Sequence, residues 1–209
     1  MPNFYNRIQG RSLERLAALS DGIFAVAMTL LVLDLHIPSA AQVHSEGQLL
    51  AALGAQGPQW IAYGMSFLTL GIFWAGQQTQ LSHIGEGARD LTWIHLGFLF
   101  SITLLPFSTR LLAEFIVYRL ALGAYWLNIL APGAMLYWSW AYASHANLIK
   151  SDTPPEIRGS ICHRILIAQS LYAAGAALCF INTWVSIAAI VLVQLNYAIA
   201  PRLWRRRRS

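Results

Sequence analysis

Four long stretches of the chain contain no Asp, Glu, Lys or Arg, and one of them continues for 37 residues. A helix that crosses the hydrocarbon core of a bilayer needs about 20 mostly apolar residues, so each stretch can supply at least one. Only 11% of the 209 residues are charged and 56% are hydrophobic, whereas soluble domains have about 25% charged residues. The pattern indicates membrane-spanning helices. The uncharged stretches are 47–85, 91–109, 120–149 and 165–201.

We expect six spans in one transmembrane domain covering residues 1–209. As a single helix, the longest stretch would extend for roughly 55 Å, nearly twice the ~30 Å hydrocarbon core, so we interpret it as a hairpin turning near Asn182–Thr183. The second span could begin near Gln48, with Pro58 bending it. The first span lacks a small-residue cleavage site, and its apolar stretch is too long for a secretory signal. The expected spans are about 16–36, 60–77, 91–109, 120–143, 165–181 and 184–200.

Lys and Arg are distributed unequally between the two sides that six spans define. Twelve of the fourteen lie on the side of both termini, and only Arg110 and Arg119 lie on the other. Cationic loops stay in the cytoplasm, so both termini are expected there, with the protein in the inner (plasma) membrane of a cell. The basic run 205–208 follows a span directly, which favours contact with anionic lipid over nucleic acid.

Motifs of enzymes and metal sites are absent from the sequence. It has no Walker loop, no HExxH and no G-x-S-x-G, and no two of its six His residues have ligand spacing on a helix. Cys162 and Cys179 lie 17 residues apart, about 25 Å along a helix, and we interpret them as small buried hydrophobic residues. We therefore expect no enzymatic activity, no metal and no cofactor.

Two acids lie in the first span, Asp21 inside it and Asp34 at its far end. A carboxylate is costly in hydrocarbon, so it usually faces protein or water and often marks an ion or substrate path. The alternative for Asp21 is a purely structural role, in which it caps the helix or pairs with Arg15 and fixes helix packing.

The same span carries an apolar stripe at helical spacing. Such a stripe usually packs against a neighbouring helix or faces lipid, so it does not by itself indicate a function. Thr29 flanks the stripe, which consists of Gly22, Val26, Leu30 and Leu33.

Three stretches resemble the lysosomal and prokaryotic potassium channels of the transmembrane protein 175 family. The first is RLAALSDGIFAVAMTLLVLDL, in which Arg15, three residues and Leu19-Ser20-Asp21 are similar to an Arg and Phe-Ser-Asp signature. The others are YGMSFLTLGIFWAGQQ at 63–78 and DLTWIHLGFLFSITLLPFSTRLL at 90–112. The resemblance covers about the first 145 residues and continues beyond them only in hydropathy.

The chain departs from the family pattern at four positions. Leu19 replaces the signature Phe, Gln77 and Gln78 stand after Trp74 where His is expected, and His95 stands where Asn is usual. Trp74, Gln77, Gln78 and His95 are therefore the candidate partners of the signature.

The resemblance implies an all-α subunit of six transmembrane helices and a homotetramer whose first helices line a central pore. It implies a potassium-permeable, leak-type cation channel without a carbonyl filter, whose partners are other copies of the chain, the bilayer and potassium ions. Val26, Leu30 and Leu33 match its constriction, and Thr29 matches a position linked to selectivity. Arg15, Ser20 and Asp21 match the signature, which is implied to be structural.

Other functions remain open at this point. A proton or small-solute transporter could use Asp21 or Asp34 as its protonation site, although the two halves of the chain show no convincing similarity to each other. A membrane enzyme could use Asp21, Gln77, His83 and His95, although no spacing favours it. A structural or partner-binding role is a further alternative, and the large apolar surface is the only sequence feature that supports it.

Overall fold

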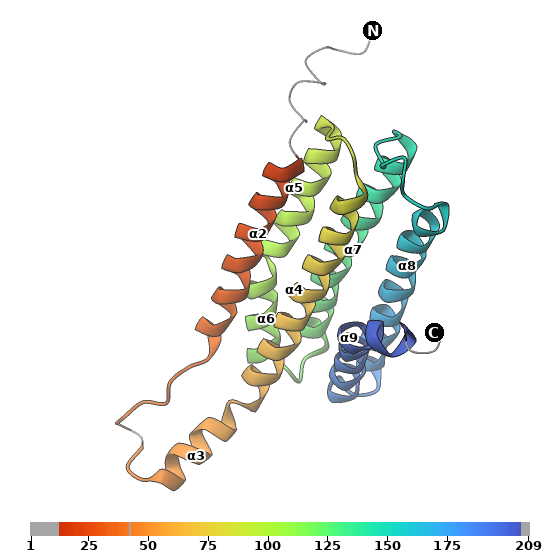
Figure 1. Ribbon diagram of the computed structural model, residues 1–209. Coiled ribbons are helices and arrows are strands. Elements are labelled where there is room, and N and C mark those ends of the chain that lie inside the picture. The colour runs from red at the N-terminus through yellow and green to blue at the C-terminus, as the bar shows by residue number, and fades with distance from the viewer. Residues whose placement is uncertain (1–12, 42, 206–209) are drawn as a thin grey trace.

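The structure is a computed structural model that describes residues 13–41 and 43–205, with side chains as far as residue 199. Within these residues, every regular element is helical apart from an isolated antiparallel bridge between Ile84 and Ile149. Arg7, Arg11 and the arginines at 206–208, which were expected on the cytoplasmic side, lie outside the described residues. The helices are α2 (Leu13–Leu30), η1 (Leu31–Asp34), α3 (Glu46–Ala55), α4 (Gly57–His83), α5 (Arg89–Thr103), α6 (Leu105–Glu114), α7 (Arg119–His145), α8 (Pro155–Ala177), η2 (Leu178–Phe180) and α9 (Thr183–Arg205) (Figure 1).

Most of the helices form an elongated antiparallel bundle (Figure 1). Helix α2 runs from the N-terminal end of the bundle to the end where α3 lies, α4 returns, α5 and α6 together run down again, α7 returns, and α8 descends. The bundle thus has an N-terminal end, where α2, α5 and α8 begin, and an α3 end. Arg15, Arg89, Lys150 and Arg158 belong to the N-terminal end, whereas Arg110 and Arg119 belong to the α3 end.

Four helical segments of the described chain are long and apolar enough to cross a membrane. Helix α4 is also long, with 27 residues, but it carries four glutamines and is less apolar than these four segments. The apolar part of α9, Thr183–Ile199, is shorter. The expected second and sixth spans correspond to these two helices. The four segments are Leu13–Asp34, Arg89–Glu114, Arg119–His145 and Pro155–Phe180.

Two breaks in the helices follow from proline. Pro58 stands in the first turn of α4, where its missing N–H is tolerated. The segment before it forms the separate helix α3, whose Ser45 accepts a hydrogen bond from the backbone N–H of Gln48. Pro106 occupies the first turn of α6 and separates it from α5. The sequence analysis expected one continuous span in this region. Helix α8 begins at Pro155, ten residues before the span that was expected there.

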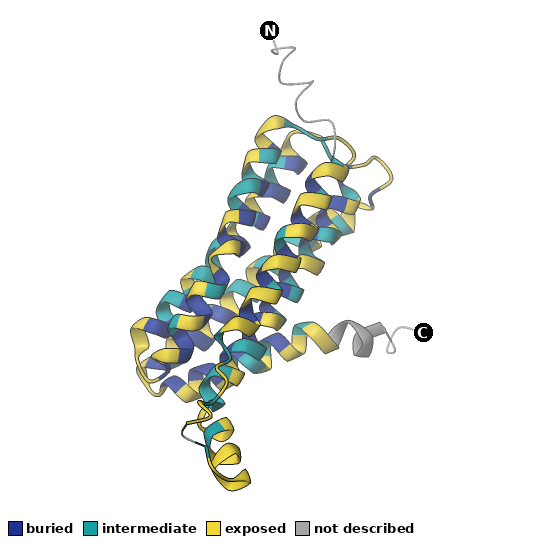
Figure 2. Cartoon of the chain, turned by 90° about the vertical axis from the view of Figure 1, so that its left-hand side faces the viewer, coloured by how far each residue is buried: buried dark blue, intermediate teal, exposed yellow. Residues whose placement is uncertain are grey.

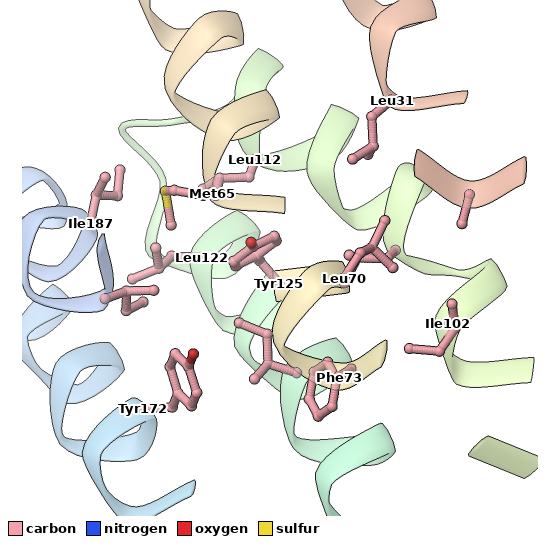
Figure 3. Packing of buried hydrophobic residues seen from close by; sticks show 14 of the residues in the cluster. Leu31, Met65, Leu70, Phe73, Ile102, Leu112, Leu122, Tyr125, Tyr172 and Ile187 are labelled. Carbon is pink, nitrogen blue, oxygen red and sulfur yellow. The ribbon is translucent and has the colours of Figure 1, made fainter. Parts of the chain in front are cut away.

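The core is apolar and runs along the interior of the bundle (Figure 3). Side chains from α2, α4, α5, α6 and α7 meet there, and Tyr172 of α8 and Ile187 of α9 close it on one side. Trp140, Tyr125, Phe24 and Phe98 are among the largest fully buried side chains. A second apolar cluster at the N-terminal end includes Leu16, Leu81, Leu91 and Trp140.

A network of buried hydroxyls crosses this core. The hydroxyl of Ser66 donates to that of Tyr125 over 3.2 Å, and Thr109 lies 2.6 Å from Ser66. The hydroxyl of Thr69 donates to the carbonyl of Met65, so it is free to accept from Tyr125 at 3.2 Å. All four of these hydroxyl side chains are almost fully buried. Polar groups in a membrane protein need internal partners, and this network ties α4, α6 and α7 together.

Replacing Tyr125 with phenylalanine is expected to reduce the free energy of unfolding by about 1 kcal/mol, because hydrogen bonds between membrane helices contribute about 0.6–1.7 kcal/mol. Thermal unfolding in detergent measures the effect. Tyr118→Phe is the matched control, because Tyr118 is largely exposed. Equal stability of the two variants would mean that the network does not stabilise the fold.

Helix α9 lies across the bundle instead of along it (Figures 1 and 2). The predicted turn is present, since η2 ends at Phe180 and α9 begins at Thr183. Gln194 of α9 is fully buried and donates to Thr69 of α4 over 2.8 Å. Near the start of α9, Ser186 donates to the carbonyl of Gly175 over 2.6 Å. These two bonds hold α9 against α4 and α8 in this orientation.

Candidate functional site

Helix α2 has two distinct faces. One face is buried in the bundle and consists of Leu16, Ser20, Phe24, Ala27 and, in η1, Leu31. Their spacing of three or four residues puts them on one side of a helix. Phe24 packs against Phe98 of α5, with 5.9 Å between ring centroids. This face forms the buried contact of α2 with the rest of the subunit.

The apolar stripe proposed from the sequence lies on the other face. Val26 is 57% exposed, Leu30 43% and Leu33 71%. Since none of the three is needed for packing inside the bundle, the stripe is available to contact lipid, another chain or a permeating ion.

An open groove of about 420 Å³ runs along this exposed face. It lies where α2 passes the junction of α5 and α6, and Thr103 and Pro106 form its far wall. An apolar groove of this kind on a subunit is typical of a surface that is covered in an assembly. The α2 residues that line it are Ala18, Leu19, Gly22, Ile23, Val26, Ala27 and Leu30.

Thr29 is exposed beside the stripe. Its hydroxyl donates to the backbone carbonyls of Ala25, over 3.0 Å, or Val26, over 2.9 Å. Its single proton is thus used within the helix, and the oxygen lone pairs remain available to a cation.

Asp21 connects α2 to α4. Its Oδ1 atom accepts a hydrogen bond from the indole N–H of Trp74 and another from the side-chain amide of Gln78, both over 2.8 Å. Bonds to a carboxylate are stronger than neutral ones, so two of them on one oxygen fix the register of the two helices. Arg15 lies two turns earlier on α2 and is exposed.

A second contact joins the same helices on the buried side. The amide of Gln77 donates to the hydroxyl of Ser20 over 2.7 Å, and that hydroxyl donates to the carbonyl of Leu16 over 2.8 Å. Ser20 and Gln77 are both fully buried. Three of the four candidate partners, Trp74, Gln77 and Gln78, therefore contact Ser20 or Asp21.

His95, the fourth candidate, bonds elsewhere. Its Nδ1 atom lies 3.1 Å from the carbonyl of Leu91 and 3.4 Å from the hydroxyl of Ser139. A carbonyl only accepts, so Nδ1 carries the proton and Nε2 is an acceptor. Nε2 is buried and has no hydrogen-bond partner among the described residues, and the same holds for Oε1 of Gln77 and of Gln80.

Asp34 lies at the α3 end and not in the middle of the helix. It is partly exposed and interacts electrostatically with Arg110 of α6 and with His36. His83, at the opposite end of α4, lies 3.1 Å from the hydroxyl of Ser82. Of the four residues of the membrane-enzyme alternative, Asp21 and Gln77 take part in neighbouring contacts between α2 and α4, whereas His83 and His95 bond elsewhere.

No pattern in the sequence indicated the hydroxyl network of Ser66, Thr69, Thr109 and Tyr125. These residues come from three helices and are separated by up to 59 positions in the chain. Isolated Ser and Thr residues are common in membrane helices, so no spacing distinguished them.

The fold and the first helix define a multi-pass helical membrane protein with an exposed apolar face. Residues 15–106 match the sequence family described as endosomal/lysosomal potassium channel TMEM175. A potassium channel of Streptomyces collinus is 32% identical over 190 residues, which cover 88% of this chain and 90% of that relative. The chain belongs to this TMEM175 family, which is a family of ion channels.

Two further relatives extend the comparison. The crystal structure of a lysosomal potassium-selective channel TMEM175 homolog from Chamaesiphon minutus superposes with a TM-score of 0.79 at 26% identity, over 90% of this chain and 97% of that one. The endosomal/lysosomal proton channel TMEM175 of Mus musculus is 34% identical over 109 residues, which are 50% of this chain and 22% of that relative.

Proposed function

We propose that the protein is a potassium-permeable, leak-type cation channel whose pore is lined by the exposed face of α2. The observation that carries this proposal is the division of α2 and η1 into a packed face and an exposed apolar stripe of Val26, Leu30 and Leu33. The potassium channels named among its relatives support the choice of ion.

In this proposal, four copies of the chain assemble around an axis parallel to α2. Rotational symmetry turns one exposed side chain into a ring, so the stripe becomes three successive apolar rings. A narrow apolar neck gates by expelling water, because an ion cannot shed its hydration shell there. No carbonyl filter is needed, and the sequence contains no TVGYG segment.

Selectivity is assigned to Thr29. Valine and leucine side chains coordinate nothing, whereas the exposed hydroxyl of Thr29 keeps its lone pairs. A ring of four hydroxyls offers oxygen ligands to a cation beside the neck. No metal or organic cofactor takes part.

The signature residues Arg15, Ser20 and Asp21 act as a structural clamp in this account. Asp21 binds Trp74 and Gln78, and Ser20 binds Gln77. The clamp fixes the rotation of α2 about its own axis, and that rotation decides which side chains face the pore.

We further propose six spans in one domain, formed by α2, α4, α5 with α6, α7, α8 and α9, with both termini in the cytoplasm and the protein in the plasma membrane. Helix α9 lies across the bundle in this structure (Figure 2), so a sixth crossing requires it to lie along the bundle in the assembly. The N-terminal end of the bundle carries Arg15, Arg89, Lys150 and Arg158, which is the cationic signature of the cytoplasmic side.

Potassium flux into proteoliposomes that contain the purified protein tests the function. The expected result is a potassium flux that exceeds sodium flux and rises linearly with the gradient. Absence of ion flux under every gradient would contradict the proposal, and saturable uptake coupled to pH would favour a transporter that uses Asp21 or Asp34.

Proton conduction is the second candidate, because the Mus musculus relative is named a proton channel. A proton gradient imposed without potassium separates the two. The potassium channel predicts little acidification of the vesicle lumen, and the proton channel predicts rapid acidification.

A further inference from the structure

A second pocket lies at the α3 end of the bundle, away from α2. It has a volume of about 270 Å³ and is enclosed by two turns, the one between α6 and α7 and the one between α8 and α9. The hydroxyl of Thr183 donates to the carbonyl of Val117 over 3.3 Å and joins the two turns. Ligand sites in proteins begin at about 300 Å³, so this pocket is sized for a small group and not for a whole lipid. The lining residues are Val117, Arg119, Cys179, Ile181, Asn182, Thr183 and Trp184.

The pocket has a positive charge with no acid on its wall. Arg119 is exposed, its guanidinium carbon lies 5.9 Å from the ring centre of Phe180, and none of the described residues that line the pocket is Asp or Glu. Arg110, the other cation that the sequence places on this side, differs because it faces Asp34. Arg119 is therefore available to an external anion.

The surroundings of the pocket are apolar and exposed. Leu120 is 84% exposed, Ile181 78% and Phe180 72%, and Trp184 on the pocket wall is half-exposed. Trp at the end of an apolar helix marks the level of the lipid headgroups, and arginine beside apolar surface holds its charged end at the same level. An anion that reaches Arg119 across this exposed apolar surface therefore comes from the membrane.

We infer that this pocket binds the phosphate group of a membrane phospholipid, with Arg119 as its counter-charge. The acyl chains then lie over Phe180, Ile181 and Leu120, outside the pocket. A guanidinium suits this role because its planar array of N–H donors matches the phosphate oxygens. The site does not involve α2, so it is independent of the channel proposal.

Native mass spectrometry of the purified protein, titrated with a short-chain phosphatidylglycerol, tests the inference. The wild-type protein is expected to retain one tightly bound lipid per subunit, and Arg119→Gln is expected to weaken that binding at least fivefold. Arg119→Lys keeps the charge and should lose less affinity. Arg158→Gln is the matched control, because Arg158 is an exposed cation at the N-terminal end. Equal affinity of Arg119→Gln and the wild type would overturn the inference.

Two competitor ligands identify what the pocket recognises. Inorganic phosphate that displaced the lipid at equal concentration would show a site for free anions and would overturn the lipid assignment. A neutral diacylglycerol that bound as tightly as phosphatidylglycerol would show an apolar groove only and would also overturn it. Weak competition by both is the expected result. Thermal unfolding of each variant confirms that the fold is retained.

Discussion

Replacing Leu30 with alanine is expected to increase the potassium flux of the reconstituted protein about fivefold, which corresponds to about 1 kcal/mol in the barrier to permeation. Leu30 is 43% exposed on the face of α2 that does not pack within the subunit. In a symmetric assembly, the change shortens four side chains in one ring, so the neck widens and water enters it more easily. Flux into proteoliposomes at equal protein content measures the effect.

Val32→Ala is the matched control for this experiment. Val32 is also exposed, at 47%, but it lies in the 3-10 helix η1, where residues three apart are eclipsed, so Leu33 and not Val32 lies in line with Leu30. Its truncation should leave the flux unchanged. Unchanged flux in Leu30→Ala, or the same increase in both variants, would contradict the assignment of Leu30 to the constriction.

Replacing Asp21 with alanine is expected to lower potassium flux at least tenfold. The variant leaves the indole N–H of Trp74 and the amide of Gln78 without their acceptor, so α2 is free to rotate and the rings lose their alignment. Flux is measured together with the oligomer mass from light scattering, because a misaligned α2 also weakens assembly. Glu14→Ala is the control, since Glu14 is an exposed acid in the first turn of the same helix.

Asp21→Asn separates geometry from charge. Both donors bind the same atom of Asp21, Oδ1, and asparagine retains a side-chain oxygen at that position. If Asp21 is a structural clamp, Asp21→Asn should keep most of the flux that Asp21→Ala loses. If Asp21 is instead a protonation site of a transporter, both variants should be equally inactive.

The helical membrane class could be predicted because it depends on features that are local in sequence. Long uncharged stretches and their lengths indicated helices, and the length of the last stretch indicated the turn that the structure has between Phe180 and Thr183. The orientation of α9 could not be predicted in this way. It depends on Gln194 meeting Thr69, a contact between residues 125 positions apart, and nothing in hydropathy distinguishes that glutamine from one that faces a headgroup.

The candidate site could be predicted only in part, for a similar reason. Helical spacing grouped Val26, Leu30 and Leu33 on one side of the first span, and the family resemblance indicated Trp74, Gln77 and Gln78 as neighbours of the signature. His95 was expected with them, but its ring lies against Leu91 and Ser139. The function of the stripe stays a prediction, because the ring that it forms exists only in an assembly.

Thiol modification of the stripe tests most directly whether α2 lines the conducting path. The protein would carry Leu30→Cys in a background without Cys162 and Cys179, and a bulky cationic thiol reagent would be added during potassium flux in proteoliposomes. The account predicts that modification of Leu30→Cys stops the flux, and that modification of Val32→Cys in the same background leaves it intact. Complete labelling of Leu30→Cys with undiminished flux would contradict the account.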